Sequence, residues 1–153
     1  MGGWEVVQAK PEHAKFIAEN MKQADVEEVW ASSKHTPIEA IVSSISLSGE
    51  TWVGLGDGEP IMIVGLVKQD MLNRGVPWML GTDALSPFTR PFLRYVKGLQ
   101  KRWLDECGFL FNYVDARHTV SVRWLEWMGF EVMEAEPFGP YNMPFHNFYM
   151  RSN

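Results

Sequence analysis

The sequence predicts an α/β fold in which about four helices flank one central mixed β-sheet. Three observations lead to this class. Segments with the alternating or continuous apolar pattern of β-strands are interleaved with segments whose apolar residues recur every three or four positions, as in α-helices. The predicted order is one strand, two helices, three strands, a helix, a strand, a helix and two strands, which places helices on the faces of a sheet. At 153 residues and 46% hydrophobic content, the chain 1–153 has the size and the core of a single domain.

The first element is a short predicted strand, and a helix follows it. The segment "WEVVQAK" at 4–10 has the β-branched and aromatic residues of a strand. Pro11 then suits the first turn of a helix, because a residue at that position needs no N–H donor. The apolar stripe of this helix is formed by Ala14, Ile17, Met21 and Ala24.

Two capping boxes indicate further helix starts. Asp25 with Glu28 has the spacing of a box that restarts the preceding helix, in which each side chain binds the backbone N–H of the other residue. Thr36 with Glu39 is a stronger example, because a proline lies at the first helical position between them. A helix with one apolar face is therefore predicted to continue to about residue 45.

Strand patterns return in the middle of the chain. Residues 51–69 are predicted to form two strands joined at Asp57-Gly58, a dipeptide that favours a tight turn between antiparallel strands. The continuous apolar run at 61–67 is typical of a strand that is covered on both faces. A third strand of this group is predicted within residues 76–85.

Helices and strands alternate in the C-terminal half. The longest helix is predicted from residue 89 to about 106, followed by a strand at 109–115 and a second helix at 118–128. Two further strands are predicted at 130–134 and 145–151, separated by a segment rich in turn residues.

Composition and charge exclude several kinds of partner. The formal net charge is −5, from 14 basic and 19 acidic residues without a basic cluster, so we expect neither nucleic acid nor an anionic membrane as a partner. No apolar run reaches the roughly 18 residues of a membrane span, and we expect no secretion by a signal peptide. One cysteine, Cys107, and four scattered histidines have no metal-ligand spacing, so we also expect no metal.

The most specific pattern lies in residues 112–132, where a strand leads abruptly into a helix that is closed by Gly-Phe. Together with the order of the elements, this helix resembles the GNAT superfamily of acyl-CoA N-acyltransferases over nearly the whole chain. Many members carry Asn, a small residue, Tyr, Gly and Phe along the helix. The residues at those places here are His118, Ser121, Leu125, Gly129 and Phe130.

A narrower resemblance covers residues 25–150. The segments "ADVEEVWAS", "PWMLGT", "NYVDARH" with "SVRWLEWMGF", and "FGPYNMPFHNF" are similar in order and spacing to a family of small GNAT-like proteins of short-tailed bacteriophages, which includes a minor internal virion protein. This resemblance implies a location in the host cytoplasm during infection, in the phage virion, or in both. It also implies partners among other phage virion proteins or host proteins.

The wider resemblance implies a site for acetyl-CoA beside the helix at 118–128. In this superfamily a strand splays from its neighbour and the next helix lines the cleft for the acyl-CoA arm. A Gly-rich turn and a helix N-terminus anchor the pyrophosphate. Transferred to this sequence, the resemblance implies cofactor contacts from Leu80, Gly81, Thr82, Ser86, Arg90, Arg94, His118, Ser121 and Trp124.

Acyl transfer to an amine also needs a proton acceptor. Asp83 and Asp115 lie near the ends of adjacent predicted strands and are the carboxylates best placed for this role, directly or through water. His118 is a third catalytic candidate, since histidine acts as an acid or a base near neutral pH. Each residue also has a structural alternative, the two aspartates as strand-end or capping residues and the histidine as an exposed first-turn residue.

Two features depart from the superfamily pattern. The segment "GTDALSPFTRPFLR" lacks the glycine-rich turn, and its prolines remove backbone donors. Arg90, Arg94 and Lys97 share one helix face and offer replacement phosphate ligands, or else they form a solvated basic face. Leu125 stands in place of the tyrosine that protonates coenzyme A, and leucine has no proton to donate.

These departures leave two hypotheses. The first, which the missing turn and tyrosine favour, is a GNAT-shaped protein with a degenerate acetyl-CoA site that serves a bacteriophage virion as a structural, ejected or assembly component. The alternative is an active N-acetyltransferase that moves an acetyl group from acetyl-CoA to an amine of a host protein or small molecule. A surplus of aromatic residues also fits a partner surface or a homo-oligomer, or else a core rich in large side chains: Trp78, Trp103, Trp124, Trp127, Phe138, Tyr141 and Phe145.

Overall fold

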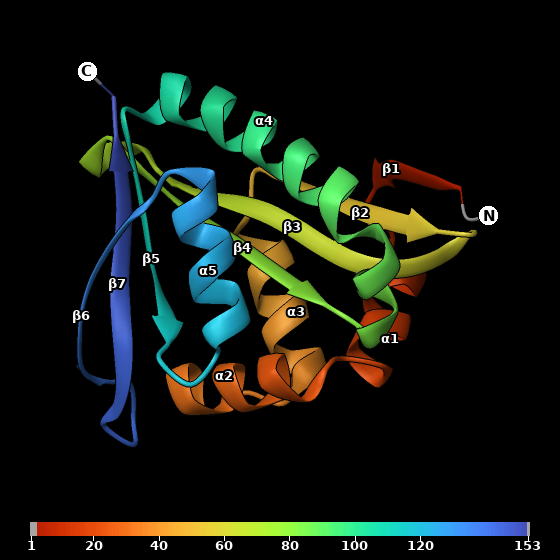
Figure 1. The fold of residues 1–153 in the computed structure, drawn as a ribbon, viewed down its shortest axis with the longest axis horizontal. Helices are drawn as coiled ribbons and strands as arrows, with labels where there is room; N and C mark the ends of the chain where they lie inside the picture. The colour runs from red at the N-terminus through yellow and green to blue at the C-terminus, as the bar shows by residue number, and fades with distance from the viewer. Residues whose placement is uncertain (1–2, 153) are drawn as a thin grey trace.

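One mixed sheet of seven strands forms the centre of the molecule, as the sequence predicts (Figure 1). The computed structural model describes residues 3–152. The strands lie in the order β1-β2-β3-β4-β5-β7-β6, and all neighbours are antiparallel except β4 and β5, which are parallel. The strands are β1 (Trp4–Gln8), β2 (Glu50–Gly56), β3 (Glu59–Gln69), β4 (Arg74–Gly81), β5 (Phe109–Asp115), β6 (Glu131–Phe138) and β7 (Met143–Arg151).

The described residues contain five α-helices, one more than predicted. They are α1 (Pro11–Glu19), α2 (Gln23–Ser33), α3 (Pro37–Leu47), α4 (Thr89–Cys107) and α5 (Thr119–Met128). Two short 3₁₀ helices follow β3 and β4, namely η1 (Asp70–Leu72) and η2 (Asp83–Phe88). None of these described helices combines the length and the apolar composition needed to cross a membrane.

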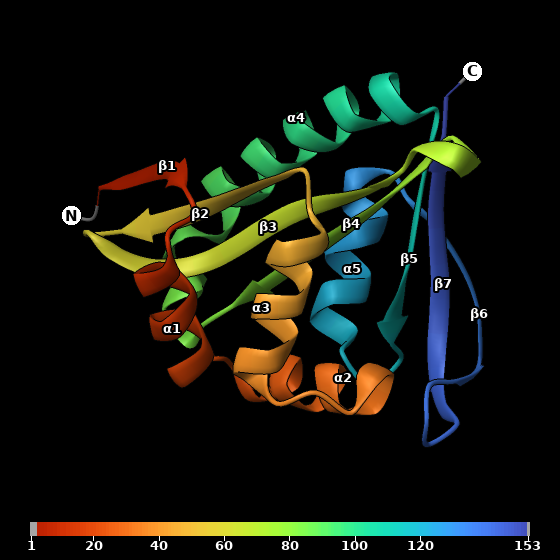
Figure 2. The ribbon, with the colours of Figure 1, turned by 180° about the vertical axis from the view of Figure 1, so that it is seen from behind.

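The helices cover both faces of the sheet. α4 and α5 lie on the face toward the viewer in Figure 1, and α1 and α3 lie on the opposite face, seen in Figure 2. α2 runs across the end of the sheet where β4 and β5 finish. Trp103 and Phe92 are buried in the core on the α4 side, and Ile17 and Ile41 in the core on the α1–α3 side. Because both faces are covered, β3 is buried over residues 61–66.

α1 and α2 are separate helices, which corrects the prediction of one restarted helix. Between them, Met21 forms an isolated antiparallel bridge with the residue after β4, and the Lys22 N–H donates to Gly81 O at 3.0 Å. This pairing interrupts the helical hydrogen bonds, so α2 starts afresh with Lys22 at its N-cap. Asp25 therefore lies buried inside the first turn, and the predicted capping box of Asp25 and Glu28 is wrong.

Other local predictions are confirmed. The Thr36 N–H donates to the Glu39 carboxylate at 2.9 Å and Thr36 Oγ1 accepts from the Glu39 N–H at 3.4 Å, which completes the capping box of α3. Asp57 and Gly58 have φ angles of 52° and 82°, as the tight turn between β2 and β3 requires. Gly129, with φ of 104°, ends α5 in the left-handed conformation.

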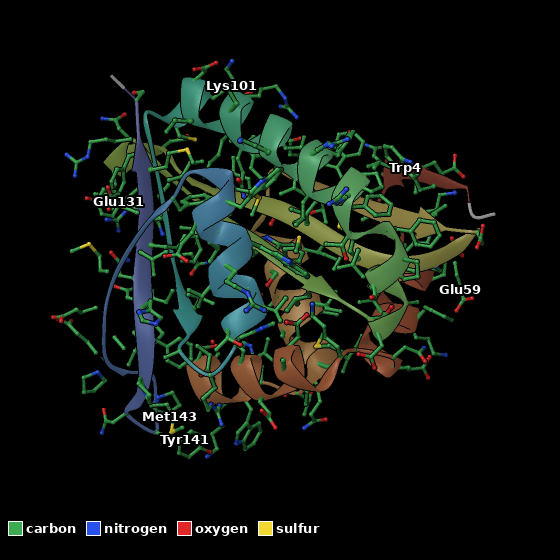
Figure 3. All side chains as sticks on the ribbon, viewed as in Figure 1. Trp4, Glu59, Lys101, Glu131, Tyr141 and Met143 are labelled. Carbon is green, nitrogen blue, oxygen red and sulfur yellow. The ribbon has the colours of Figure 1, made fainter. Side chains whose placement is uncertain are left out.

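The last two strands are longer than predicted. Their pairing continues through residues 136–138 and 143–145, so the connecting turn is confined to 139–142. Tyr141 lies at the tip of this hairpin (Figure 3), and its ring stacks on Trp30 of α2 with a centroid distance of 6.3 Å. The hairpin therefore reaches back to α2 at the end of the sheet.

Most of the aromatic residues proposed for a partner surface lie at least partly in the interior. Trp103 and Phe145 are 0% and 1% exposed, and within that predicted group only Trp127 and Tyr141, at 51% and 46%, are largely exposed in the described structure. These aromatic residues therefore serve mainly to fill the core. The predicted homo-oligomer or partner surface remains a prediction that rests on few of them.

Candidate functional site

β4 and β5 separate after one matched pair, and the residues that separate them are identifiable. In the described structure the two strands pair at Gly75 and Leu110. Pro77, two residues further along the same edge of β4, has no N–H to continue the ladder. The Asn112 side chain enters the gap instead, where Nδ2 donates to Pro77 O at 2.8 Å and Oδ1 accepts from the Tyr113 N–H at 2.8 Å. Because this amide binds both backbone groups, the strands diverge beyond it.

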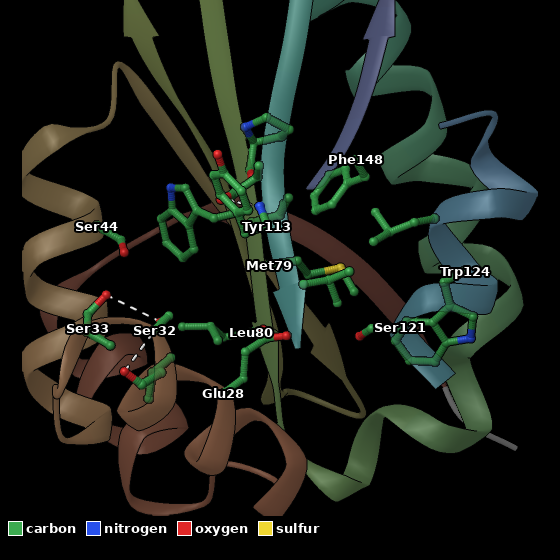
Figure 4. Close-up of a pocket in the computed structure, with 18 of the residues that line it drawn as sticks. Glu28, Ser32, Ser33, Ser44, Met79, Leu80, Tyr113, Ser121, Trp124 and Phe148 are labelled. Atoms are coloured by element: carbon green, nitrogen blue, oxygen red, sulfur yellow. Dashed lines mark hydrogen bonds between the residues drawn. The ribbon is translucent and has the colours of Figure 1, made fainter. Parts of the chain in front are cut away.

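A cavity of about 360 Å³ occupies the opening between the strands (Figure 4). Ser44 lines it from α3, on one face of the sheet, and Ser32 lines it from α2, at the end of the sheet. Ser121 and Trp124 line it from α5, on the other face. The cavity therefore passes between β4 and β5 from one face of the sheet to the other.

Met79 of β4 presents its backbone to this cavity. The Thr82 N–H donates to Ile61 O of β3. The backbone N–H and C=O groups of even-numbered residues at this end of β4 therefore point toward β3, and those of odd-numbered residues point toward the gap. Along the odd-numbered edge, Pro77 O is bound by the inserted amide, and Gly81 is bound at both its N–H and its C=O. Met79 lies between these two residues and lines the cavity. No residue of the described β5 is paired with it.

Glu28 of α2 supplies the one carboxyl group among the described residues that line the cavity. In Figure 4 the side chains of Glu28 and Ser121 point toward each other from α2 and α5. Glu28 Oε2 accepts from the Asp115 N–H at 2.8 Å, at the end of β5.

The surroundings of Glu28 shift its proton equilibrium toward neutral pH. Desolvation raises the pKa, the hydrogen bond from Asp115 lowers it, and the negative charge of Asp25 raises it again. The resulting pKa is about 7, against the ordinary 4.5. A carboxyl group that gains and loses a proton near neutral pH is suited to general acid–base chemistry.

A buried bridge connects α2, the end of β4 and the start of α5. Asp25 Oδ2 accepts from the Gly81 N–H at 2.8 Å, and Asp25 Oδ1 lies 2.7 Å from Nε2 of His118, the N-cap residue of α5. Ser121 Oγ lies 3.1 Å from the same Nε2. In a Ser–His–Asp relay the two neighbours bind opposite ring nitrogens. The shared nitrogen therefore makes this a structural bridge across the wide end of the opening.

A second hollow lies beside the cavity, between the start of α4 and α5. We call it the arginine hollow, and it is lined by Arg90, Leu93, Arg94, Arg123, Trp124 and Trp127. Within residues 3–152, no ion pair neutralises its three arginines. Lys22 and Lys97 add positive charge, with their Nζ atoms 4.6 Å and 4.8 Å from the ring centroids of Trp124 and Trp127. Trp124 lines both the arginine hollow and the cavity, so the two spaces meet at this side chain.

The turn before α4 offers few backbone donors to an anion. The N–H groups of Ala84, Leu85 and Thr89 are bound within the turn, by Thr82 and Ser86. The two prolines of this segment have no N–H. A phosphate group at the start of α4 would therefore depend on side chains rather than on a backbone cradle.

Five of the predicted cofactor contacts lie at the cavity or at the arginine hollow. Leu80, Ser121 and Trp124 line the cavity. Arg90 and Arg94 line the arginine hollow, where Trp124 joins them. These residues come from β4, α4 and α5, so the fold brings together side chains up to 44 positions apart, from Leu80 to Trp124.

The other four predicted cofactor contacts lie elsewhere. Gly81 and Thr82 use their N–H groups within the protein, on Asp25 and β3. Ser86 is exposed on η2. His118 is 5% exposed and forms the buried bridge, so its interpretation as an exposed first-turn residue is wrong.

The two predicted catalytic aspartates are not among the cavity-lining residues. Asp83 is exposed on η2. Asp115 is buried and pairs with Arg117 at 2.7 Å. Burial raises the pKa of Asp115, but the hydrogen bonds and charge of Arg117 outweigh it, and the pKa lies below its ordinary value. In residues 3–152, no group of three or more His, Cys, Asp and Glu side chains is placed to hold a metal ion.

Sequence reasoning missed the roles of Glu28, Asp25 and Asn112. The partners of the two acidic residues, Asp115 and His118, are 87 and 93 positions away, so no local pattern marks these contacts. A detectable sign was Pro77 inside a predicted strand, because proline interrupts pairing on one edge.

The fold is that of known acetyltransferases. It resembles the acetyltransferase of GNAT family from Streptococcus pneumoniae, with a TM-score of 0.64, 11% identity, and coverage of 98% of this chain and 100% of that chain. Spermidine N-acetyltransferase from Vibrio cholerae, solved with CoA and spermine, gives a TM-score of 0.69, 13% identity, and coverage of 97% and 95%. The ribosomal-protein-S18-alanine N-acetyltransferase from Escherichia coli gives a TM-score of 0.67, 10% identity, and coverage of 97% and 94%.

Sequence comparison alone finds no relative: no protein-family model and no curated protein matches the chain. The identities of 10% to 13% show a shared fold and nothing finer. The predicted GNAT-like α/β fold is confirmed. The narrower resemblance to bacteriophage proteins stays a prediction.

Proposed function

We propose that this protein binds an acyl-CoA thioester and transfers its acyl group to an amine. The observation that carries the proposal is that a cationic hollow and a mainly apolar cavity meet at Trp124. Coenzyme A has the matching form, with an anionic nucleotide at one end and a long uncharged arm that ends in sulfur. The spermidine N-acetyltransferase of the same fold was solved with CoA, which supports this choice of ligand.

The residues present fit such a ligand, although they differ from a glycine-rich turn. Arg90, Arg94 and Arg123 would hold the phosphate groups, because guanidinium groups form charge-assisted hydrogen bonds with phosphate. Trp127 is half exposed and offers an aromatic face to the base. The arm would pass Trp124 into the cavity.

The cavity also holds groups suited to acyl transfer. In this reaction the amine nitrogen bonds to the thioester carbonyl carbon, the C–S bond breaks, and the departing thiolate takes up a proton. Glu28 would accept the proton that the amine loses. The Met79 N–H would donate to the carbonyl oxygen, where negative charge develops. Leu125 lines the cavity without a proton to give, so Ser121, toward which Glu28 points, would pass the proton taken up by Glu28 on to the thiolate.

The acceptor amine would enter from the opposite face of the sheet, between α2 and α3. Ser32, Ser33 and Ser44 line the cavity there, and Glu28 lies between them and Ser121 (Figure 4). The amine of a host protein or a small molecule would then reach Glu28 before it meets the thioester.

A second candidate is a role without catalysis. The bound N–H groups before α4 and the Asp25–His118 bridge across the wide end of the opening favour a degenerate acetyl-CoA site. With the narrower sequence resemblance, this supports a structural, ejected or assembly component of a phage virion. Its partners would then be other virion proteins or a host protein.

Calorimetric titration of acetyl-CoA and CoA into the purified protein, at near-physiological salt, distinguishes the two candidates. We expect micromolar binding of both ligands. The combined variant Arg90→Ala, Arg94→Ala and Arg123→Ala should weaken it by roughly 30-fold, or about 2 kcal/mol, because three phosphate contacts are lost.

The control variant combines Lys15→Ala with Lys101→Ala. Both lysines are exposed and lie outside the arginine hollow, Lys101 on the outer side of α4 (Figure 3). It should bind within about twofold of the wild type, since distant exposed charges are screened. No heat up to millimolar ligand, with an unchanged melting temperature, would reject the acyl-CoA proposal in favour of the role without catalysis.

A further inference from the structure

The inner wall of the cavity contains a buried polar group without a partner. Gln100 of α4 is 5% exposed, and its buried Oε1 has no hydrogen-bond partner within the described part of the chain. Buried side-chain polar atoms are nearly always bonded, because an unbonded one has lost its hydrogen bonds to water without replacement. Gln100 also lines the cavity, so a change of its side-chain rotamer would bring Oε1 to a ligand there, which would supply the missing partner.

Gln100 lies toward the narrow end of the opening. α4 begins just after η2, at the wide end of the opening, and ends beside Gly75, where β4 and β5 pair. The last residue of α4, Cys107, is close enough to Gly75 that a Cβ added to this glycine would lie 3.1 Å from Cys107 Sγ. Gln100 is ten residues beyond Arg90, which corresponds to about 15 Å along the helix axis. A ligand with its phosphates in the arginine hollow therefore needs an extended arm to reach Gln100.

The surroundings of Gln100 indicate which chemical group it would bind. Val64, Val96 and Phe148 line the same cavity. The residues of α4 in the described lining are not ionisable, whereas Glu28 and the other ionisable lining residues lie on other elements. A charged group at this apolar wall would lack a counter-ion, so the bound group is neutral. A side-chain amide offers an acceptor oxygen and two N–H donors, which match a hydroxyl group.

We propose that Gln100 selects the acyl group, and that the preferred acyl group is a short chain, longer than acetyl, that carries a hydroxyl group. This inference rests on the proposed function, because the acyl end of the thioester must lie in the cavity. The hydroxyl donates to Gln100 Oε1 and accepts from Nε2, while the chain carbons pack on Val96 and Phe148. The arginine hollow and the arm are common to all CoA thioesters, so Gln100 acts on the acyl group alone.

The test compares calorimetric titrations of CoA, butyryl-CoA and 3-hydroxybutyryl-CoA. The wild type should bind the hydroxyl-bearing thioester about tenfold more tightly than butyryl-CoA, because only the former completes the hydrogen bonds of the buried amide. This comparison needs no variant. Gln100→Leu, which is similar in size without an amide, should abolish or reverse the preference and leave CoA affinity within about twofold.

Melting temperatures separate selectivity from a structural role. Without ligand, Gln100→Leu should melt at a higher temperature than the wild type, since leucine removes an unbonded buried amide. If Gln100 mainly supported the fold, the same change would lower the melting temperature. Gln23→Leu, an exposed glutamine on α2, serves as the control and should keep the wild-type preference among the three ligands.

Three outcomes would overturn the inference. Equal affinity of the wild type for the two thioesters, with CoA still bound, would overturn it and leave acyl-CoA binding intact. A loss of CoA affinity in Gln100→Leu as large as the loss for the hydroxyl-bearing thioester would show that Gln100 acts on the whole ligand. Failure of all three ligands to bind would reject the proposed function, and the inference with it.

Discussion

Glu50 and Glu28 are both partly buried glutamates, and the protein shifts their pKa values in opposite directions. Glu50, at the start of β2, accepts from two nitrogens of Arg102 at 3.0 Å and 2.9 Å and from the indole N–H groups of Trp52 and Trp103 at 2.6 Å and 3.0 Å. The hydrogen bonds from Arg102 outweigh desolvation and lower its pKa to about 2. Glu28 has one backbone donor in the described structure, and desolvation raises its pKa to about 7.

The number of donors separates the two roles. Glu50 is fully bonded, stays charged, and joins β2 to α4, so it is a structural junction. Glu28 keeps part of its carboxyl group free beside a cavity and changes charge near neutral pH, as a proton acceptor in acyl transfer must.

The largest effect is expected on activity at Glu28. Glu28→Gln should lower the rate of CoA release from acetyl-CoA, in the presence of a primary amine acceptor, by about a thousandfold, because the amide cannot take the amine proton. Its affinity for acetyl-CoA should stay near that of the wild type. Glu27→Gln, at the exposed neighbouring position, is the matched control and should keep full activity. Equal rates for Glu28→Gln and the wild type would remove Glu28 from the mechanism.

The next effect is on stability at Glu50. Glu50→Ala should lower the free energy of unfolding by about 3 kcal/mol in urea, since it leaves two indole N–H groups without their acceptor and leaves Arg102 with Glu106 as its remaining acceptor. Acetyl-CoA affinity, measured by calorimetry, should not change. Glu59→Ala, at the exposed outer end of β3 (Figure 3), is the control and should cost less than about 0.5 kcal/mol. Unchanged stability of Glu50→Ala would show that the junction contributes nothing.

The smallest effect is the dependence of stability on pH. Between 4.5 and about 7 the folded protein holds a proton on Glu28 that the unfolded chain has lost, so the free energy of unfolding falls as pH rises through this window. Urea unfolding should show this decrease for the wild type but not for Glu28→Gln. Glu50, with its pKa lowered to about 2, contributes stability that is present above 4.5 and lost as pH falls toward 2. Identical profiles of Glu28→Gln and the wild type above pH 4.5 would contradict the raised pKa of Glu28.

Local patterns predicted most of the fold, because helices and strands have distinct periodicities and their ends have distinct chemistry. The Thr36 capping box, the Asp57-Gly58 turn and the glycine closure of α5 are set by neighbouring residues and were found as predicted. The break between α1 and α2 could not be predicted, because it depends on pairing of Met21 with the residue after β4.

The candidate site was harder to predict, because its contacts join distant segments. Arg90 and Arg94 share a helix face and were found from spacing, but Arg123 joins them only where α5 packs beside α4. Glu28 and Asp25 fit a helix cap in sequence, and their contacts with β5 and α5 depend on how α2 crosses the end of the sheet. Contacts between such distant residues can be identified only from the three-dimensional structure.

The most direct test of the acyl-CoA site is an NMR titration of ¹⁵N-labelled protein with acetyl-CoA. Side-chain N–H groups give separate signals from the candidate site around Glu28 and from the structural junction around Glu50. We expect the indole signals of Trp124 and Trp127 and the side-chain amide signals of Asn112 and Gln100 to shift, while the indole signal of Trp103, which is bound to Glu50, stays in place. Unshifted signals of Trp124 and Trp127 at millimolar acetyl-CoA, or shifts confined to the region of Glu50, would contradict it.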